Sequence, residues 1–394
     1  MVEECTPTVN TGLRGVTVAT TKISDVDGAA GKLIYRGYLA KDLAKSASFE
    51  EIVFLLFYEK LPTADELISF RNDLASQRAI PQAIVDMMKL MPADAMPMDV
   101  LQACVCILAQ FDPDTGDTTR EGALRMANRL VARLATVLAA WERIRNGKEP
   151  VAPDASLSHA ANFLYMLTGN MPEDDVAHFF DVCLILHAEH SFNASTFSAR
   201  QIASTRAHMY AAIAGAIGSL SGELHGGANV RVMEMLLKIG SAANVDDYIA
   251  TELDAGRVIF GLGHAVYQTD DPRAHILAPM SKIMGQRIGQ PQWYEMSTIL
   301  EKKGKAAFKK RKGIDIYVNV DFYSASLYYA MGIAVDLFTP VFAISRIAGW
   351  TAHVIEERYA GAAPKAALYR PASDYVGDYC GPEECAFVPI DERK

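Results

Sequence analysis

The chain has 394 residues, a length that favours two domains or one elaborated domain, because a single hydrophobic core rarely grows so large. Half of the residues are hydrophobic and 22% are charged, as in ordinary soluble globular enzymes. A formal net charge of −9 argues against nucleic acid as a general partner.

The start of the chain and its cysteines favour a cytoplasmic protein without membrane association. Residues 1–7 have neither the basic nor the apolar region of a signal peptide. The most apolar window, Ala211 to Leu220, is too short to cross a bilayer. The six cysteines have no framework spacing, so reduced thiols are the simplest account.

The first forty residues predict short strands, and the rest of the chain predicts helices almost without a break. Residues Val16–Thr20 and Lys32–Tyr35 are expected to be strands, with a turn at Asp25–Gly28 between them. Ser48 and Thr63 are each followed three residues later by a glutamate, which is the capping-box pattern of a helix start. No repeat of 20–50 residues appears, which argues against a solenoid.

Two of the expected helices have unusual composition. After Pro172, apolar residues recur at three- and four-residue steps, and His187 and His190 are expected to extend that apolar face. The segment His187–His190 lacks the HExxH spacing of a zinc site, so no metal is predicted there. The helix around Ala211–Gly218 is mostly alanine and glycine, which fits either a buried central helix or a subunit interface.

Two histidines stand in glycine-bearing loops, and either could act on a carbonyl group. His225 precedes a helix expected to begin near Ala228, where the helix dipole favours the neutral imidazole. A neutral imidazole can donate a hydrogen bond to a carbonyl oxygen, as stabilisation of an enol requires. His264 follows Gly261-Leu262-Gly263, which lacks the third glycine of a dinucleotide fingerprint. A backbone-bonded turn histidine and a surface loop are the respective alternatives.

A carboxylate and an arginine complete this group. Asp321 is flanked by apolar and aromatic residues, so desolvation would raise its pKa and make it a competent base. A helix cap or an ion-pair partner is the alternative for Asp321. Arg273 follows Pro272 and suits recognition of a carboxylate. One carboxylate and two imidazoles suit removal of a carbon-bound proton followed by stabilisation of the enolate.

The order of these motifs resembles the citrate synthase family over nearly the whole chain. The similarity includes residues 28–38, 187–197 and 338–355, both histidine loops and Asp321. It implies an all-α fold with short N-terminal strands, in which a large helical domain (1–225 and 333–394) carries a smaller inserted helical domain (226–332). It also implies a homodimer of the tricarboxylic acid cycle that acts on oxaloacetate and acetyl-CoA.

The resemblance also implies a role for individual residues. Asp321 is expected to take the methyl proton of acetyl-CoA, His225 to stabilise the enol, and His264 to protonate the ketone of oxaloacetate. Oxaloacetate is expected to be held by His190, Arg273, Arg346 and Arg370, of which Arg370 reaches the site of the neighbouring subunit. Coenzyme contacts are expected at Leu262, Gly263, Ala265 and Lys312, and neither a metal nor another cofactor is expected.

Some positions depart from the family pattern and leave alternatives open. Glu223 stands near His225 where a proline is common, and Gln268 replaces a basic residue that would contact a coenzyme phosphate. The basic cluster Lys302–Lys312 could replace that contact, or form a solvated helix face. Ser324–Ser326 also occurs in 2-methylcitrate synthases, so propionyl-CoA is an alternative substrate. A non-catalytic protein that binds CoA thioesters is a further alternative, although all three catalytic positions carry competent residues.

Overall fold

The computed structural model describes residues 10–13, 15–264, 266–377 and 387–393. In these residues the chain forms sixteen α-helices and three short strands, so the predicted all-α fold is confirmed. The helices before the first histidine loop are α1 (Ala40–Ser46), α2 (Phe49–Tyr58), α3 (Ala64–Ser76), α4 (Gln82–Lys89), α5 (Pro97–Leu108), α6 (Arg120–Arg145), α7 (His159–Thr168), α8 (Asp174–His187), α9 (Ala194–Ser204) and α10 (Met209–Leu220). The later helices are α11 (Ala228–Ile239), α12 (Val245–Asp254), α13 (Ala274–Arg287), α14 (Gln292–Lys312), α15 (Asp321–Ala330) and α16 (Phe338–Arg358).

The strands form one antiparallel sheet in chain order, and one of the two strand predictions was wrong. The sheet consists of β1 (Ser24–Asp27), β2 (Lys32–Tyr35) and β3 (Tyr38–Leu39), and β2 lies where predicted. Residues 16–20 form no strand. Of the predicted turn, residues 25–27 belong to β1, and only Gly28 lies in the turn. The reason is hairpin geometry, because β2 needs a partner close in sequence and residues 28–31 supply the reversal. The Asp27 carboxylate closes this turn by accepting the Ala30 N–H at 2.8 Å.

Helices α2 and α3 begin where the capping boxes predicted. The hydroxyl of Ser48 accepts the N–H of Glu51, whose carboxylate in turn accepts the N–H of Ser48 at 2.8 Å. Thr63 and Glu66 repeat this arrangement at the start of α3. The α2 helix is buried along nearly its whole length, so its start also fixes part of the hydrophobic core.

The helix after Pro172 ends earlier than the sequence predicted. Helix α8 stops at His187, and the chain then turns a corner before α9, with Ser191 at a positive φ of 52°. The prediction that His190 continues the apolar face of α8 was therefore wrong. The side chain of Glu189 explains the turn, because its buried carboxylate bonds to Ser24 and His353 from other elements.

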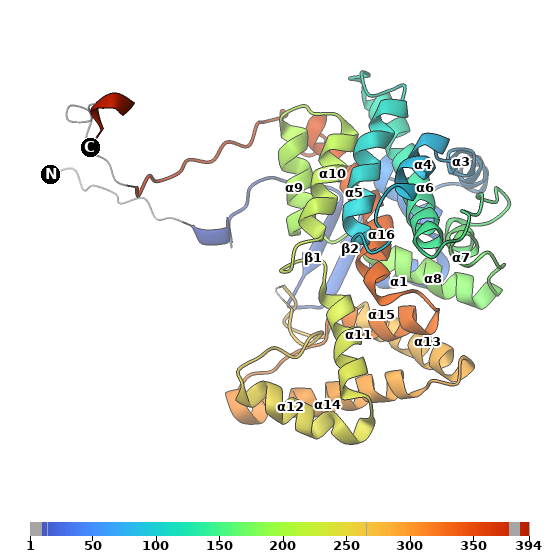
Figure 1. Ribbon diagram of the computed structural model, residues 1–394, viewed down its shortest axis with the longest axis vertical. Coiled ribbons are helices and arrows are strands. Elements are labelled where there is room, and N and C mark those ends of the chain that lie inside the picture. The colour runs from blue at the N-terminus through green and yellow to red at the C-terminus, as the bar shows by residue number, and fades with distance from the viewer. Residues whose placement is uncertain (1–9, 14, 265, 378–386, 394) are drawn as a thin grey trace.

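The helices fall into two spatial groups with the β-hairpin at their junction (Figure 1). One group contains α3 to α10, with α16 running through its centre and packing against α6, α8, α9 and α10. The other contains α11 to α15, in which α13 packs against α15 and α12 against α14. This second group covers the residues expected in an inserted domain, and the boundary at residues 226–332 stays a prediction.

The alanine- and glycine-rich helix is α10, and its small residues serve close packing within the chain. A Cβ atom at Gly215 would lie 2.2 Å from a terminal methyl of Ile202 in α9, and one at Gly218 would lie 2.7 Å from Gln102 in α5. Both glycines are nevertheless half-buried rather than buried. The alternative of a subunit interface on this helix therefore stays open.

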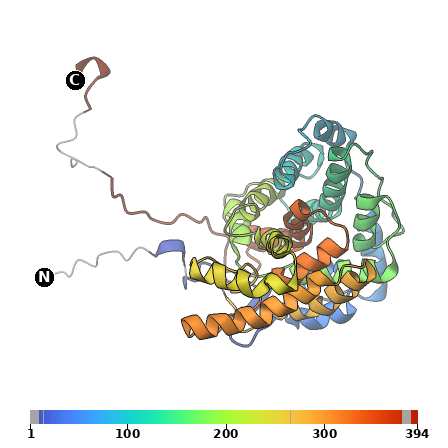
Figure 2. The same cartoon turned by 60° about the horizontal axis from the view of Figure 1, so that its bottom comes forward.

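Both ends of the described chain extend away from the helices. In Figures 1 and 2 the N-terminal and C-terminal segments leave the body on the same side, near α9 and α10. Several apolar side chains on the C-terminal segment are exposed, including Leu368, Tyr375 and Val376. Of the helices in the described residues, none is both long enough and apolar enough to span a membrane.

Candidate active site

A cavity of about 710 Å³ lies where the α8–α9 corner, the turn before α11 and two loops meet. One of those loops carries His264 and Arg273, and the other leads into α15. The cavity brings together seven of the residues predicted from the sequence, which are His190, His225, Gly263, His264, Arg273, Asp321 and Arg346.

His225 lies in the turn between α10 and α11, as predicted, and is held in one tautomer. Its Nε2 accepts a hydrogen bond from the Ser195 N–H at 3.1 Å, so the proton of the neutral ring sits on Nδ1. Burial and the charge of Arg346 lower the pKa of His225 to about 4. At neutral pH this ring is therefore uncharged and can donate from Nδ1.

The unusual neighbour of His225, Glu223, does not reach the ring. Its side chain is 73% exposed and pairs with Arg231 of α11 at 3.1 Å. The two effects that lower the pKa of His225 are burial and Arg346, so this glutamate leaves the protonation of the histidine unchanged.

His264 is held in the opposite tautomer. The N–H groups of Val266 and Tyr267 both donate to its Nδ1 at 3.0 Å, which leaves the proton on Nε2. Burial and the charge of Arg273 lower the pKa of His264 to about 4, against an opposing effect of Asp271. The ring centroid of His264 lies 5.6 Å from that of His190, so two neutral imidazoles border the same space.

Asp321 begins α15 and is tied by backbone hydrogen bonds to the His264 loop. The N–H of Gly263 donates to the Tyr317 carbonyl at 2.7 Å, and the N–H of Asn319 donates to the Gly261 carbonyl at 3.0 Å. Burial raises the pKa of Asp321 to about 6, although Arg273 and Arg346 oppose the rise. At neutral pH it is thus an ionised base with a raised proton affinity.

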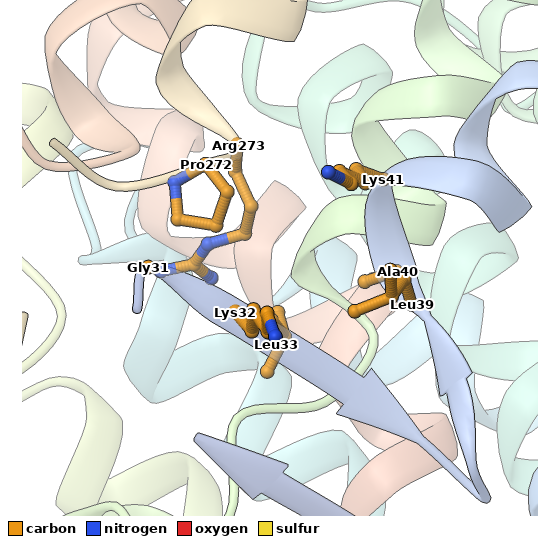
Figure 3. Close-up of a pocket in the computed structure, with 8 residues that line it drawn as sticks. All are labelled: Gly31, Lys32, Leu33, Leu39, Ala40, Lys41, Pro272 and Arg273. Atoms are coloured by element: carbon orange, nitrogen blue, oxygen red, sulfur yellow. The ribbon is translucent and has the colours of Figure 1, made fainter. Parts of the chain in front are cut away.

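The two arginines of the cavity are buried in different ways. Arg273 is held by Asp271 through two hydrogen bonds, at 2.9 and 2.7 Å. Figure 3 shows Arg273 beside Gly31 and Lys32 of the hairpin, around a small separate cavity. Arg346 donates to the His187 carbonyl at 2.7 Å and forms no ion pair with any carboxylate of the described residues. Burial lowers the pKa of Arg346 to about 10, which still leaves the guanidinium charged at neutral pH. Arg346 is therefore a buried positive charge without a direct counter-ion among the described residues.

His190 faces the cavity with a free ring nitrogen. Its Nε2 is buried without a hydrogen-bond partner among the described residues, and burial holds the pKa of the ring well below its usual value. The neighbouring Glu189 anchors this corner, since its Oε1 accepts from Ser24 at 2.7 Å and from His353 at 3.0 Å. The Tyr35 hydroxyl also donates to the Glu189 carbonyl at 3.0 Å.

The sequence did not predict the roles of three residues that support the site, which are Ser195, Glu189 and Asp271. Ser195 and Glu189 lie within the segment 187–197 that resembles the family, but nothing local indicates their partners. Asp271 had a usable signal, since an aspartate and an arginine on either side of Pro272 can face each other across a fixed turn.

The remaining predicted site residues lie elsewhere. Leu262 is buried behind the cavity against Gly304 of α14, and Lys312 is exposed with its ammonium over the Phe308 ring at 5.2 Å. Arg370 is exposed on the C-terminal segment, and Ala265 lies outside the described residues. Within the basic cluster, Lys303 pairs with Asp246 at 2.6 Å, which fits a solvated helix face for that part.

A group of possible metal ligands lies outside the cavity. Asp270, His275 and Glu301 are close enough to hold a cation together. The ammonium of Lys305 already bonds to both carboxylates, at 2.8 and 2.6 Å, and supplies the positive charge there. The cluster therefore functions as an internal ion-pair network.

Comparison with known proteins identifies the relatives of this chain. The family model described as "Citrate synthase, C-terminal domain" matches residues 12–372. The citrate synthase of Haloferax volcanii is 44% identical over 97% of this chain and 98% of its own length. A 2-methylcitrate synthase of Mycobacterium tuberculosis is 38% identical over 94% of this chain and 91% of its own length.

The chain is also similar to a solved structure, the citrate synthase of Thermoplasma acidophilum in a ternary complex with carboxymethyl coenzyme A and oxaloacetate. The two superpose with a TM-score of 0.89 at 30% identity, over 98% of this chain and 100% of that one. The chain therefore belongs to the citrate synthase family of enzymes.

Proposed function

We propose that the protein condenses acetyl-CoA with oxaloacetate and hydrolyses the resulting thioester to citrate and CoA. The observation that carries this proposal is the ionisation pattern of the cavity. A carboxylate with a pKa of about 6 faces the same space as two neutral imidazoles that present opposite nitrogens as donors. That set suits proton removal from a carbon next to a carbonyl, with hydrogen bonds to the oxygens where charge develops.

The first step is formation of the enol. Asp321 takes a proton from the methyl group of acetyl-CoA. The electron pair of the broken C–H bond forms a carbon–carbon double bond, and the π electrons of the carbonyl move onto the thioester oxygen. His225 donates a hydrogen bond from Nδ1 to that oxygen. Because the imidazole is neutral, it stabilises the enol without transferring a full positive charge into the cavity.

The second step forms the carbon–carbon bond. The enol carbon attacks the ketone carbon of oxaloacetate, and His264 gives its Nε2 proton to the ketone oxygen. Arg346, Arg273 and His190 hold the dicarboxylate. Arg346 gains most from an incoming carboxylate, because it has no direct counter-ion among the described residues. Water then hydrolyses the citryl thioester: His264 recovers its proton from the attacking water, and Asp321 gives its proton to the departing CoA thiolate.

The protein is further proposed to act as a homodimer. The half-buried small residues of α10 can pack against a second copy across a two-fold axis, the commonest closed arrangement. Leu368 and Val376 of the C-terminal segment are exposed apolar residues that a second copy would cover. Arg370 lies on this segment and is proposed to complete the oxaloacetate site of the other subunit.

The arrangement of the helices in two spatial groups supports the coenzyme part of the proposal. Two of the residues proposed to carry out the chemistry, His264 and Asp321, come from the group α11 to α15 and its loops, whereas His190 and Arg346 come from the other group. Gly263, Leu262, Ala265 and Lys312 are proposed as coenzyme contacts on the smaller side, where closure would exclude water from a hydrolysable thioester.

Propionyl-CoA is the second candidate substrate, because a 2-methylcitrate synthase is 38% identical to this chain over 94% of its length. Release of free thiol, measured at steady state with oxaloacetate and either thioester, decides between the two. We expect oxaloacetate-dependent release with the higher kcat/KM for acetyl-CoA. A higher value for propionyl-CoA would favour the second candidate, and no release with either would refute both.

A matched pair of variants links the activity to the cavity. His225→Gln removes the proposed donor, whereas Glu223→Gln changes an exposed side chain two residues away. We expect His225→Gln to reduce turnover about 10²–10³-fold, the usual effect of losing a donor to a developing oxyanion. Glu223→Gln should retain the native rate, and equal losses in the two variants would contradict the role of His225.

A further inference from the structure

The β-hairpin at the junction of the two helix groups contacts the cavity at both of its ends. At its base, the hydroxyl of Ser24 donates to Glu189 at 2.7 Å and accepts the Ser191 N–H at 3.1 Å. These bonds hold the corner that carries His190. Between base and tip, Asp25 and Val26 of β1 form part of the cavity wall.

At its tip, the hairpin presses against the loop that holds His264. The N–H of Gln268 donates to the Gly28 carbonyl at 2.8 Å. A Cβ atom at Gly28 would lie 2.2 Å from the Val266 carbonyl oxygen, so only glycine permits this approach. Gly31 makes a similar contact, because a Cβ atom there would lie 3.0 Å from the Thr269 methyl group.

The contact matters because Val266 also holds the catalytic ring. Its N–H and that of Tyr267 donate to Nδ1 of His264 and so keep the proton on Nε2. The Val266 carbonyl and the Tyr267 N–H belong to one planar peptide unit, so moving that unit away from the hairpin would lengthen the second of these bonds. Farther along, Arg273 and Pro272 line a small cavity with the hairpin residues Gly31 and Lys32 (Figure 3).

We propose that the β1–β2 hairpin is a positioning element that fixes His264 relative to His190, with Gly28 as its contact on the His264 loop. The hairpin belongs to the N-terminal segment, whereas His264 lies beyond α11 and α12, so this spacing is set across the two helix groups. Its kinetic consequence rests on the proposed function, in which both histidines border the oxaloacetate. Its structural consequence, the tautomer of His264, does not depend on that function.

Gly28→Ala tests the proposal. Gly28 does not require a positive φ, so the added methyl group strains only the contact with Val266. We expect kcat/KM for oxaloacetate to fall on the order of 10- to 100-fold, the scale of a small misplacement of a catalytic group. The matched control is Ala29→Ser, at the next residue of the same exposed turn, which should retain the native value.

A second measurement separates positioning from loss of structure. In ¹⁵N-histidine NMR spectra, with His264 assigned through His264→Gln, native His264 should have an unprotonated Nδ1, and Gly28→Ala should shift it toward a mixture of tautomers. The unfolding midpoint in urea should stay close to native. Native kinetics and an unchanged Nδ1 signal in Gly28→Ala would overturn the proposal, whereas an inactive native enzyme with the shifted signal would refute only the proposed function.

If Gly28→Ala does not fold, the second contact of the hairpin with this loop, between Gly31 and Thr269, can be strained from the loop side. Thr269→Ile adds a methyl group to the side chain that faces Gly31, and Thr269→Val keeps the original shape. We expect Thr269→Ile to shift the Nδ1 signal of His264 and to lower kcat/KM for oxaloacetate, while Thr269→Val does neither. The same values in both variants would contradict the positioning role.

Discussion

At the scale of single residues, the surroundings of each ionisable group decide its chemistry. Histidine and aspartate are ordinary residue types, yet burial lowers the pKa of His225 and His264 to about 4 and raises that of Asp321 to about 6. Backbone N–H donors then select which ring nitrogen carries the proton. Sequence reasoning predicted the raised pKa of Asp321 from its apolar neighbours, but the tautomers depend on Ser195 and Val266.

Replacement of the proposed base should separate catalysis from binding. We expect Asp321→Asn to lose about 10²–10⁴-fold in turnover, the range for a general base. Oxaloacetate affinity, measured by calorimetry, should change little because Arg273 and Arg346 are proposed to hold its carboxylates. Undiminished exchange of the acetyl methyl protons with solvent in this variant would rule out Asp321 as the base.

The raised pKa of Asp321 also predicts a stability that depends on pH. A carboxyl group that titrates at about 6 in the folded protein and near 3.8 in the unfolded chain binds its proton more tightly when folded. This group therefore stabilises the folded state at low pH, and the free energy of unfolding falls as pH rises from about 4 to about 6. Asp321→Asn removes the cost of burying an ionised carboxylate. The variant should therefore be more stable than the native protein above pH 6, by up to about 3 kcal/mol.

Urea unfolding at pH 5 and pH 8 measures this difference, at one protein concentration because assembly contributes to stability. The stability gain of Asp321→Asn should be larger at pH 8. The control Asp94→Asn changes an exposed carboxylate in the loop after α4 and should show no such increase. A gain that is the same at both pH values would contradict the burial of an ionised Asp321.

At the scale of elements, local signals worked where partners lie within one helical turn. The capping boxes placed the starts of α2 and α3 correctly because Ser48 and Thr63 bond to groups three residues away. The same reasoning failed at β1 and at the end of α8. A strand needs a partner strand, and the corner at Glu189 needs Ser24 and His353, which are distant in sequence.

The cap of α2 predicts a measurable contribution to stability. Ser48→Ala removes the hydroxyl that accepts from Glu51 and from Arg71, the latter at 2.9 Å. We expect the free energy of unfolding to fall by about 1–2 kcal/mol, measured in urea. Ser76→Ala, at the exposed end of α3, is the matched control and should have a much smaller effect; equal losses would show that the cap is not responsible.

At the scale of the whole molecule, the cavity collects residues from positions 25 to 346. Both groups of helices contribute residues to its lining, and the hairpin lies between them. Arg370 is exposed outside this cavity, on a segment that leaves the body of the chain. This placement fits a residue that acts on a second copy, and the proposal can be tested by exchanging subunits.

Hybrid dimers provide that test. Arg370→Ala and Asp321→Asn should each have low activity alone, and mixing them under conditions of proven subunit exchange should restore activity. If Arg370 acts across the interface, a hybrid carries both defects in one site and leaves the other site intact. Continued inactivity of the mixture would place Arg370 in its own subunit's site, and full activity of a monomer would contradict the dimer altogether.

The sequence by itself determined the helical fold, the starts of α2 and α3, and the residue types for the chemistry at positions 225, 264 and 321. These depend on patterns within a few residues or on motifs that resemble a family. Only the tertiary structure decided that Ser24–Asp27 is a strand, that His190 lies at a corner, and which nitrogen of each histidine is protonated. The reason is physical: pKa, tautomer and close backbone contact depend on burial and on neighbours such as Ser195 and Gly28, which folding brings from distant parts of the chain.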